Sequence, residues 1–234
     1  MGSNSSKQTA ADTLLEITPR RRHEQPIEPE LTNTTLHQAL QNVAQYLRSS
    51  KAQITIIAVG GAINTLLLKT RTTTHDLDFF DHNLRKDELQ LMTRAAKYAQ
   101  SKDSNLPDEW LNNRTVLFIR REIRAELTQA SIELNEAVFD EPGLRVLAAP
   151  WPYALCAKLD RIAGSMGLIA GKEYDIDDAV AYLHRYLTIK RKRSMTRSEI
   201  LKWTAHYGTR INDGVLDQLN GEFNRRHGWV PMVG

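Results

Sequence analysis

The sequence is poor in cysteine and has no long hydrophobic run. Its 234 residues contain a single cysteine, Cys156, which excludes an intramolecular disulfide and is typical of a reducing compartment. No apolar run approaches the roughly 18 residues that a membrane-spanning helix needs. We therefore expect a cytoplasmic protein without a transmembrane segment.

An excess of charge of one sign is missing as well. The 31 Lys and Arg residues nearly balance the 28 Asp and Glu residues, and the formal net charge is only +3. Overall charge thus does not indicate nucleic-acid binding. The run KRKR at 190–193 is compatible with an RNA contact or a nuclear import signal, but a solvated helix end is the commoner explanation.

The first 34 residues contain few large apolar side chains. They are rich in Ser, Thr, Pro, Glu and Arg, and they cannot bury enough surface to offset the entropy of ordering. We expect a disordered tail over residues 1–34.

The chain starts with MGSNSSK, which fits the pattern for N-myristoylation with Gly2 as the acylated residue. It resembles the start of the Src family of kinases. A Ser-rich start without a lipid, or a cloning remnant, explains the same letters. Since one myristoyl chain binds a bilayer only marginally, Gly2 predicts at most a weak, peripheral membrane association.

Helix and strand patterns alternate between residues 36 and 101. Apolar residues at helical spacing begin at Leu36, and the β-branched run QITIIAVGG follows. The pattern predicts a helix from 36, a strand over 53–59, a short helix over 62–70, a strand over 75–81 and a helix over 86–101. This order indicates an α/β fold.

The rest of the chain is predicted to be mostly helical. The spacing of Leu117, Ile123 and Leu127 favours a helix over 117–134, and LRVLAAP reads as a strand that Pro150 ends. Further helices are expected over 151–164, 172–187, 196–206 and 211–226. We therefore predict an α/β domain over 35–150 and a helical C-terminal domain over 151–234.

Two aspartates one residue apart lie on the second predicted strand. In a strand, residues i and i+2 share a face, so Asp76 and Asp78 project together while Leu77 and Phe79 face a core. Neighbouring carboxylates repel each other unless a cation lies between them, and this donor pair suits Mg²⁺, with Mn²⁺ as the alternative. The pair is the candidate metal site.

Two glycines, Gly60 and Gly61, end the first predicted strand. Without a Cβ, they let the backbone approach a ligand, and free amides at a helix start favour phosphate. A metal pair and a phosphate cradle together are typical of a site for a nucleoside triphosphate.

The glycine pair, a short helix and the run Thr74, Asp76 and Asp78 follow one another in a fixed order, with Arg71 shortly before the run. This order resembles the signature of the polymerase-beta-like nucleotidyltransferase superfamily. The likeness is closest to its branch of AbiEii-like toxins and related uncharacterised domains. It implies a small nucleotidyltransferase-type mixed sheet flanked by helices.

The C-terminal half resembles the later motif of the same branch. A lysine on one helix, Lys158, is followed by Asp175 and Asp178 at the start of the next helix, and DEWLNN at 108–113 resembles a Trp-Leu-Asn-Asp segment. The likeness covers roughly residues 55–190. An ion pair of Lys158 with Asp160, Asp175 or Asp178 is the structural alternative to a catalytic role.

The resemblance implies transfer of a nucleoside monophosphate from a triphosphate to a hydroxyl group, with release of pyrophosphate. Asp76 and Asp78 would hold the metal. The glycines would hold phosphate, Arg71 and Thr74 would position the loop or the substrate, and Lys158 with the Asp175 and Asp178 pair would complete the site. The acceptor stays open between RNA, a protein and a small molecule.

One departure favours an alternative. Many members of the family carry a third carboxylate on a later strand, and this chain offers only Glu133 or Asp140 for it. A catalytically inactive nucleotide-binding or protein-interaction module with the same fold, tethered to a membrane or not, is therefore the second hypothesis.

Overall fold

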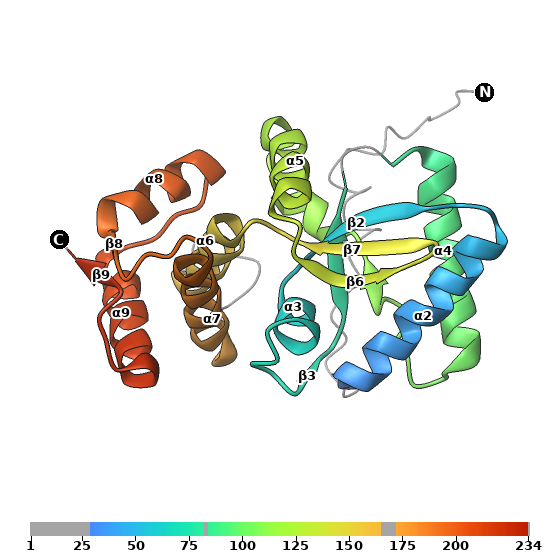
Figure 1. The fold of residues 1–234 in the computed structure, drawn as a ribbon, viewed down its shortest axis with the longest axis horizontal. Coiled ribbons are helices and arrows are strands. Elements are labelled where there is room, and N and C mark those ends of the chain that lie inside the picture. Colours follow the sequence, from blue (N-terminus) through green and yellow to red (C-terminus); the bar gives the residue numbers. More distant parts are fainter. Residues whose placement is uncertain (1–28, 82–83, 165–171, 234) are drawn as a thin grey trace, which may run out of the picture.

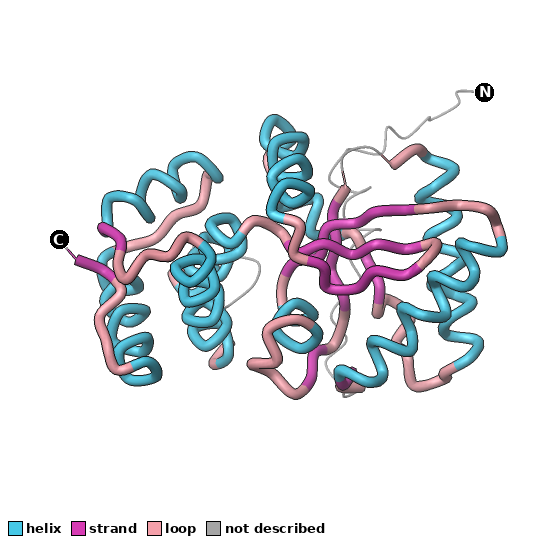
Figure 2. The backbone as a smooth tube through the Cα atoms, in the orientation of Figure 1, coloured by secondary structure: helices cyan, strands magenta, loops and turns pink. Residues whose placement is uncertain are grey.

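A mixed sheet with flanking helices forms one half of the molecule, and helices form the other (Figure 1). The structure is a computed structural model that describes residues 29–81, 84–164 and 172–233. The predicted fold class is confirmed. Figure 2 shows the main strands gathered together, with the C-terminal helices beside them. Gly2 and most of the predicted tail lie outside the described residues.

The sheet has five strands in the order β5-β4-β2-β7-β6. The strands are β2 (Ile54–Val59), β4 (Leu77–Phe80), β5 (Leu111–Asn112), β6 (Ala137–Glu141) and β7 (Leu144–Ala148). Strand β2 is parallel to β7 and antiparallel to β4, and β4 is parallel to β5. Strand β2 is the central strand, and its β-branched residues favour a strand that is largely buried. The edge strands β5 and β6 were not predicted.

Helices α2 (Asn33–Ser49) and α4 (Lys86–Lys102) cover one face of the sheet (Figure 1). Leu36, Leu40 and Val43 of α2 are fully buried in one core with Ile54 and Ile56 of β2. This is the apolar face that the spacing of these residues predicts.

The other face carries a second, smaller core. It contains Ile57, Phe80, Ile123, Leu127 and Tyr153. The covering segment consists of the 3₁₀ turns η1 (Arg114–Phe118) and η2 (Arg121–Ile123) and of helix α5 (Arg124–Leu134).

The prediction of one continuous helix over 117–134 is wrong at its start. Helix α5 begins at Arg124, and Leu117 is 63% exposed instead of buried. The Arg124 guanidinium donates hydrogen bonds to the carbonyls of Val116 and Ile119, at 2.7 and 3.1 Å, and so satisfies the irregular backbone before the helix.

The predicted end of the N-terminal tail at residue 34 is too late. Strand β1 (Leu31–Thr32) pairs with β3 (Thr73–Thr74), and Leu31 is buried. The side chain of Thr32 caps α2 by accepting a hydrogen bond from the amide of Thr35. The ordered domain therefore starts a few residues earlier than expected.

Four helices form the C-terminal part: α6 (Trp151–Ile162), α7 (Tyr174–Ile189), α8 (Arg197–Tyr207) and α9 (Asp213–His227). They agree with the predicted helices to within a few residues, and the short strands β8 (Met195–Thr196) and β9 (Met232–Val233) pair beside them. Leu155, Tyr182 and Leu219 belong to the same core as Ile56. The two parts are thus packed into one body, with helix α3 (Gly61–Leu66) between the sheet and α7 (Figure 1).

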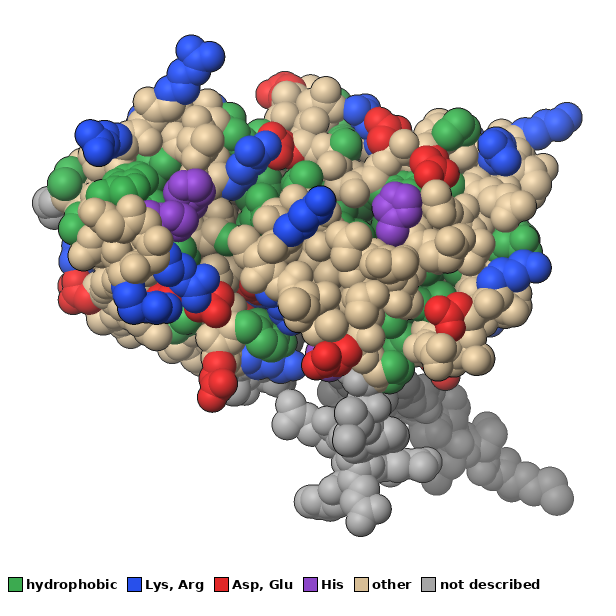
Figure 3. Space-filling model, turned by 60° about the horizontal axis from the view of Figure 1, so that its bottom comes forward, with side chains coloured by type: hydrophobic (Ala, Val, Ile, Leu, Met, Phe, Trp, Pro, Cys, Tyr) green, Lys and Arg blue, Asp and Glu red, His purple; other side chains and the backbone are tan. Residues whose placement is uncertain are grey.

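The surface supports the reading of the basic run as a helix end. Lys190 follows α7, and Lys192 pairs with Glu199 at 3.0 Å. Acidic and basic side chains are interspersed over the face shown in Figure 3, which carries no broad patch of one sign. Among the described residues, no helix has the length and apolar character that crossing a membrane requires.

Candidate functional site

The glycine turn and the aspartate strand are direct neighbours. Strand β2 ends at Val59, which pairs with Asp78 across the antiparallel ladder, and Gly60 follows. A Cβ on Gly60 would lie 4.0 Å from Oδ2 of Asp78. The glycine pair and the aspartate pair, which 14 residues separate in the sequence, are therefore side by side in the structure.

The backbone of the turn requires glycine at both positions. Gly60 has a φ of 76°, a conformation that side chains rarely adopt. At Gly61, the first residue of α3, a Cβ would lie 2.5 Å from Oγ1 of Thr74 and 2.8 Å from Nη1 of Arg71. Two of the predicted site residues thus pack directly onto the second glycine.

Asp78 carries an unusual charge environment. Burial, and after it the charge of the neighbouring Asp76, raise the pKa of its carboxyl group to about 7. Arg114, a hydrogen bond with Asn112, and Arg161 lower this pKa but do not cancel the rise. The positive charges near Asp78 therefore leave the pKa of its carboxyl group close to neutral pH.

A second aspartate pair lies on α7, and Lys158 of α6 bridges it. The ammonium of Lys158 is 2.8 Å from Oδ1 of Asp175 and 2.7 Å from Oδ2 of Asp178. Lys158 is 4% exposed, and both aspartates are at most 1% exposed. Burial acts to raise the pKa of Asp175, but the charge and hydrogen bond of Lys158 and the amide of Lys172 outweigh it, so the pKa is lowered.

Arg71 joins the α/β part to this pair. Its Nη1 lies 3.3 Å from Oδ2 of Asp178, and its guanidinium lies 3.9 Å from the centre of the Tyr174 ring. Since Arg71 also borders Gly61, the predicted residues from both halves of the chain form one continuous cluster. Thr74 is buried there and donates a hydrogen bond to the carbonyl of Asp76 at 3.3 Å.

The sequence did not single out the residues that hold the glycine turn from the helical side. The hydroxyl of Tyr182 donates to the carbonyl of Gly60 at 2.9 Å and accepts from the side chain of Asn64 at 2.8 Å. Asn64 accepts in turn from the hydroxyl of Thr70 at 2.9 Å. The signal was available, because Asn64 and Tyr182 are polar groups on otherwise apolar helix faces.

Arg161, Asn112 and Arg114 were also missed. Arg161 lies one turn after Lys158 on α6, with Nε 3.4 Å from Oδ2 of Asp175. Asn112 falls within DEWLNN, which the resemblance marked only as a segment, and it pairs with Asp78 in the ladder. Spacing from Lys158 was the one sequence signal for Arg161.

The candidate third carboxylates do not join the site. Glu133 is exposed on α5 and accepts a hydrogen bond from Gln129, and Asp140 on the edge strand β6 pairs with Arg145 at 3.1 Å. Within residues 29–81, 84–164 and 172–233, no three His, Cys, Asp or Glu side chains gather as metal ligands.

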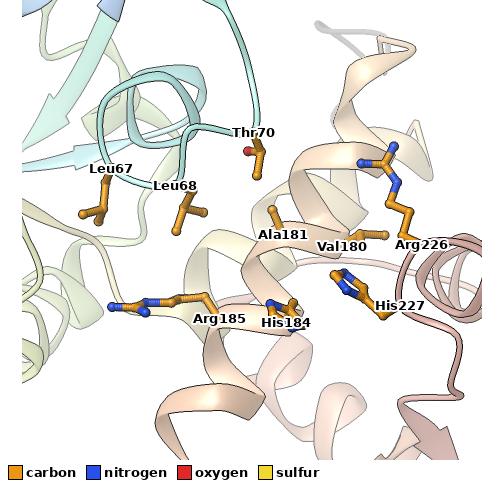
Figure 4. A pocket seen from close by; sticks show the side chains of 9 residues that line it. All are labelled: Leu67, Leu68, Thr70, Val180, Ala181, His184, Arg185, Arg226 and His227. Carbon is orange, nitrogen blue, oxygen red and sulfur yellow. The ribbon is translucent and has the colours of Figure 1, made fainter.

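A hollow of about 360 Å³ lies beside the site, between the α3–β3 loop, α7 and α9 (Figure 4). Leu67, Leu68, Thr70, Val180, Ala181, His184, Arg185, Arg226 and His227 line it. Both of its arginines already form ion pairs, Arg185 with Glu136 and Arg226 with Asp177. None of the predicted site residues lines this hollow, so it is separate from the aspartate cluster.

Comparison with known proteins identifies a family. The family model described as "Domain of unknown function (DUF7582)" matches residues 29–229. No curated protein and no solved structure matches the chain. The matched range includes the glycine turn, both aspartate pairs and Lys158.

Proposed function

The chain belongs to the DUF7582 family, and we propose that it is a Mg²⁺-dependent nucleotidyltransferase that moves a nucleoside monophosphate from a triphosphate to an acceptor hydroxyl and releases pyrophosphate. One observation carries the proposal. The glycine turn meets the strand pair at Asp78, whose pKa is raised, and the positive charge of Arg161 on α6 acts on the same carboxyl group. This is an arrangement suited to a metal-bound triphosphate.

Asp76 and Asp78 would hold the metal ion. Burial and the repulsion of Asp76 raise the pKa of Asp78, and a divalent cation would relieve that repulsion. Mg²⁺ is commonly held by one or two carboxylates together with waters and substrate phosphates. The donor set therefore fits Mg²⁺, and Mn²⁺ as its substitute. When bound, the ion would neutralise charge on the triphosphate and lower the pKa of a coordinated oxygen.

Gly60 and Gly61 have no side chains, and the phosphates would approach the backbone at this turn. A side chain at Gly61 is excluded by contacts with Thr74 and Arg71, whereas a Cβ at Gly60 would have Oδ2 of Asp78, at 4.0 Å, as its one near neighbour among the described residues. Arg71 supplies positive charge at the edge of this turn while Asp178 and Tyr174 fix its guanidinium. Orientation of the phosphate chain by fixed groups lowers the entropic cost of the transfer.

Lys158 acts in this scheme as the residue that holds the α7 pair in place, since both of its short contacts are with carboxylates. Oδ1 of Asp178 is buried and has no hydrogen-bond partner among the described residues. It can accept the proton of an incoming hydroxyl. The acceptor oxygen would attack the α-phosphorus, the proton would pass to Asp178, and the bond to the leaving pyrophosphate would break.

A label-transfer experiment tests the proposal. The purified protein is incubated with Mg²⁺, each α-labelled triphosphate in turn, and total RNA, protein extract or small metabolites as acceptors. We expect labelled product with the wild-type protein and none with the Asp76→Asn/Asp78→Asn double variant. Asp103→Asn, outside the site, serves as the matched control. Absence of label on every acceptor class would reject the transferase.

A second candidate is binding without transfer, as a nucleotide-binding or protein-interaction module. It is favoured by the lack of a third carboxylate near Asp76 and Asp78 among the described residues. Isothermal titration with a triphosphate separates the two candidates. Binding that persists in the Asp76→Asn/Asp78→Asn variant, with no release of pyrophosphate from the wild-type protein, supports the module.

A further inference from the structure

Arg161 lies between the two aspartate pairs. It is the last charged residue of α6, one turn after Lys158, and its Nε is 3.4 Å from Oδ2 of Asp175. Its positive charge also acts on Asp78, on the opposite wall of the site. The guanidinium of Arg161 therefore interacts electrostatically with one aspartate of each pair.

The other cations of the site are already occupied. Lys158 is almost fully buried between two carboxylates, and Arg71 is held by Asp178 and the Tyr174 ring. Arg114 pairs with Glu109 at 2.5 Å. Each of these groups would have to give up a close partner before binding a ligand.

Arg161 differs from them. Its Nε is buried and has no hydrogen-bond partner within the described part of the chain, although its side chain is 25% exposed. Its contact with Asp175, at 3.4 Å, is longer than the two contacts of Lys158 with Asp175 and Asp178, at 2.8 and 2.7 Å. A buried N–H group without a partner is costly, and a ligand that accepts its hydrogen bond would remove that cost.

We propose that Arg161 is a further phosphate-binding residue of this site, whose guanidinium donates hydrogen bonds to phosphate oxygens of the nucleoside triphosphate. The planar fork of arginine matches phosphate geometry and keeps its charge at every relevant pH. The inference rests on the proposed function for the identity of the ligand. It assigns anion binding on α6 to Arg161, because Lys158 is already paired with two carboxylates.

Binding of tripolyphosphate tests this role without catalysis. Affinity is measured by isothermal titration with Mg²⁺ present, for the wild-type protein and for Arg161→Gln and Arg161→Lys. We expect about tenfold weaker binding or more in Arg161→Gln, and an intermediate loss in Arg161→Lys, which keeps the charge without the fork. Arg145→Gln, on β7 next to the edge strand β6, is the matched control and should bind as the wild-type protein does.

The outcomes separate this inference from the function. Binding by Arg161→Gln within twofold of the wild-type value, with circular dichroism showing a folded protein, overturns the role of Arg161 whether or not transfer occurs. If Arg161→Gln is not folded, Arg161→Lys decides, and an unchanged affinity in that variant overturns the role as well. Loss of tripolyphosphate binding in the variants, with no label transfer by the wild-type protein, upholds Arg161 and rejects the transferase.

Discussion

The two aspartate pairs of this protein have the same side chains and opposite surroundings. Asp175 and Asp178 on α7 are buried, and the ammonium of Lys158 lies between them and pairs with both. At Asp78 on β4, burial and the neighbouring Asp76 outweigh the nearby arginines, and the pKa is raised to about 7. The environment, not the residue type, therefore distinguishes the two pairs, and in the proposed function the strand pair is the one that binds a metal cation.

Removing Lys158 should have the largest effect on stability, because Asp175 and Asp178 would lose the ammonium that pairs with both. We expect Lys158→Met to lower the free energy of unfolding by about 3–5 kcal/mol, since two buried carboxylates lose their shared cation. Urea denaturation at pH 7 measures this. Lys202→Met, on an exposed position of α8, should change the value by less than about 0.5 kcal/mol. A similar small loss in Lys158→Met would show that the bridge contributes little.

The pH dependence of stability should have opposite signs at Asp78 and at Asp175. For Asp78 the folded pKa is above the unfolded one, so its contribution is complete below about pH 4 and is lost as the pH rises through about 7. In metal-free protein we expect a decrease of about 2 kcal/mol over that window, a discounted value because Asp78 is partly exposed. For Asp175 the folded pKa is lowered, so its contribution is present above about pH 4 and is lost in stronger acid.

The Asp78→Asn variant is the control for this experiment. Its unfolding free energy, measured by urea denaturation in EDTA, should be flat between pH 4 and 7 where the wild-type curve falls. The acid limb below pH 4 should remain, because it belongs to Asp175. Identical curves for the two proteins would place the pH dependence elsewhere.

Magnesium should stabilise the strand pair selectively. With a dissociation constant of about 1 mM, 10 mM Mg²⁺ raises the free energy of unfolding by about 1.4 kcal/mol through mass action. Thermal unfolding with and without Mg²⁺, against a Ca²⁺-free and ionic-strength-matched blank, detects this. The Asp76→Asn/Asp78→Asn variant should show no shift, and a shift of equal size there would refute the assignment.

The smallest effect on stability is expected from loss of the hydrogen bond between Tyr182 of α7 and Gly60. Tyr182→Phe removes the hydroxyl that binds Gly60 and Asn64, and should cost about 1 kcal/mol of stability. Hydrogen exchange of the amides in 60–66 should become faster. Tyr98→Phe, whose ring packs on Tyr46, is the control and should leave that exchange unchanged. Unchanged exchange in Tyr182→Phe would mean that the turn is held by its own backbone.

Much of the fold followed from periodicity, and the exceptions have physical causes. The helices beginning at Lys86, Trp151 and Tyr174 have long apolar faces, and they were predicted closely. The region 105–141 has no such period. There the backbone is satisfied by a side chain, Arg124, and by short edge pairing in β5 and β6, which local patterns do not encode.

The site was predictable where its residues are neighbours along the chain. Gly60, Gly61 and the strand aspartates share one β-α-β unit, so their contact follows from the chain order. The roles of Arg161 and Tyr182 depend on how α6 and α7 pack against that unit. The sequence marks Arg161 only as a helical neighbour of Lys158 and Tyr182 only as a polar group on an apolar helix face, and their contacts arise from tertiary structure.

The most direct measurement is the binding of Mn²⁺, as a paramagnetic substitute for Mg²⁺, followed by electron paramagnetic resonance. With a triphosphate present, we expect the wild-type protein to bind Mn²⁺ and the Asp76→Asn/Asp78→Asn variant to lose that binding. The Asp175→Asn variant, which alters the pair completed by Lys158, should retain the Mn²⁺ signal if it is folded by circular dichroism. Binding that survives in the strand variant, or that is absent from the wild-type protein, would contradict the assignment of the strand pair as the metal site.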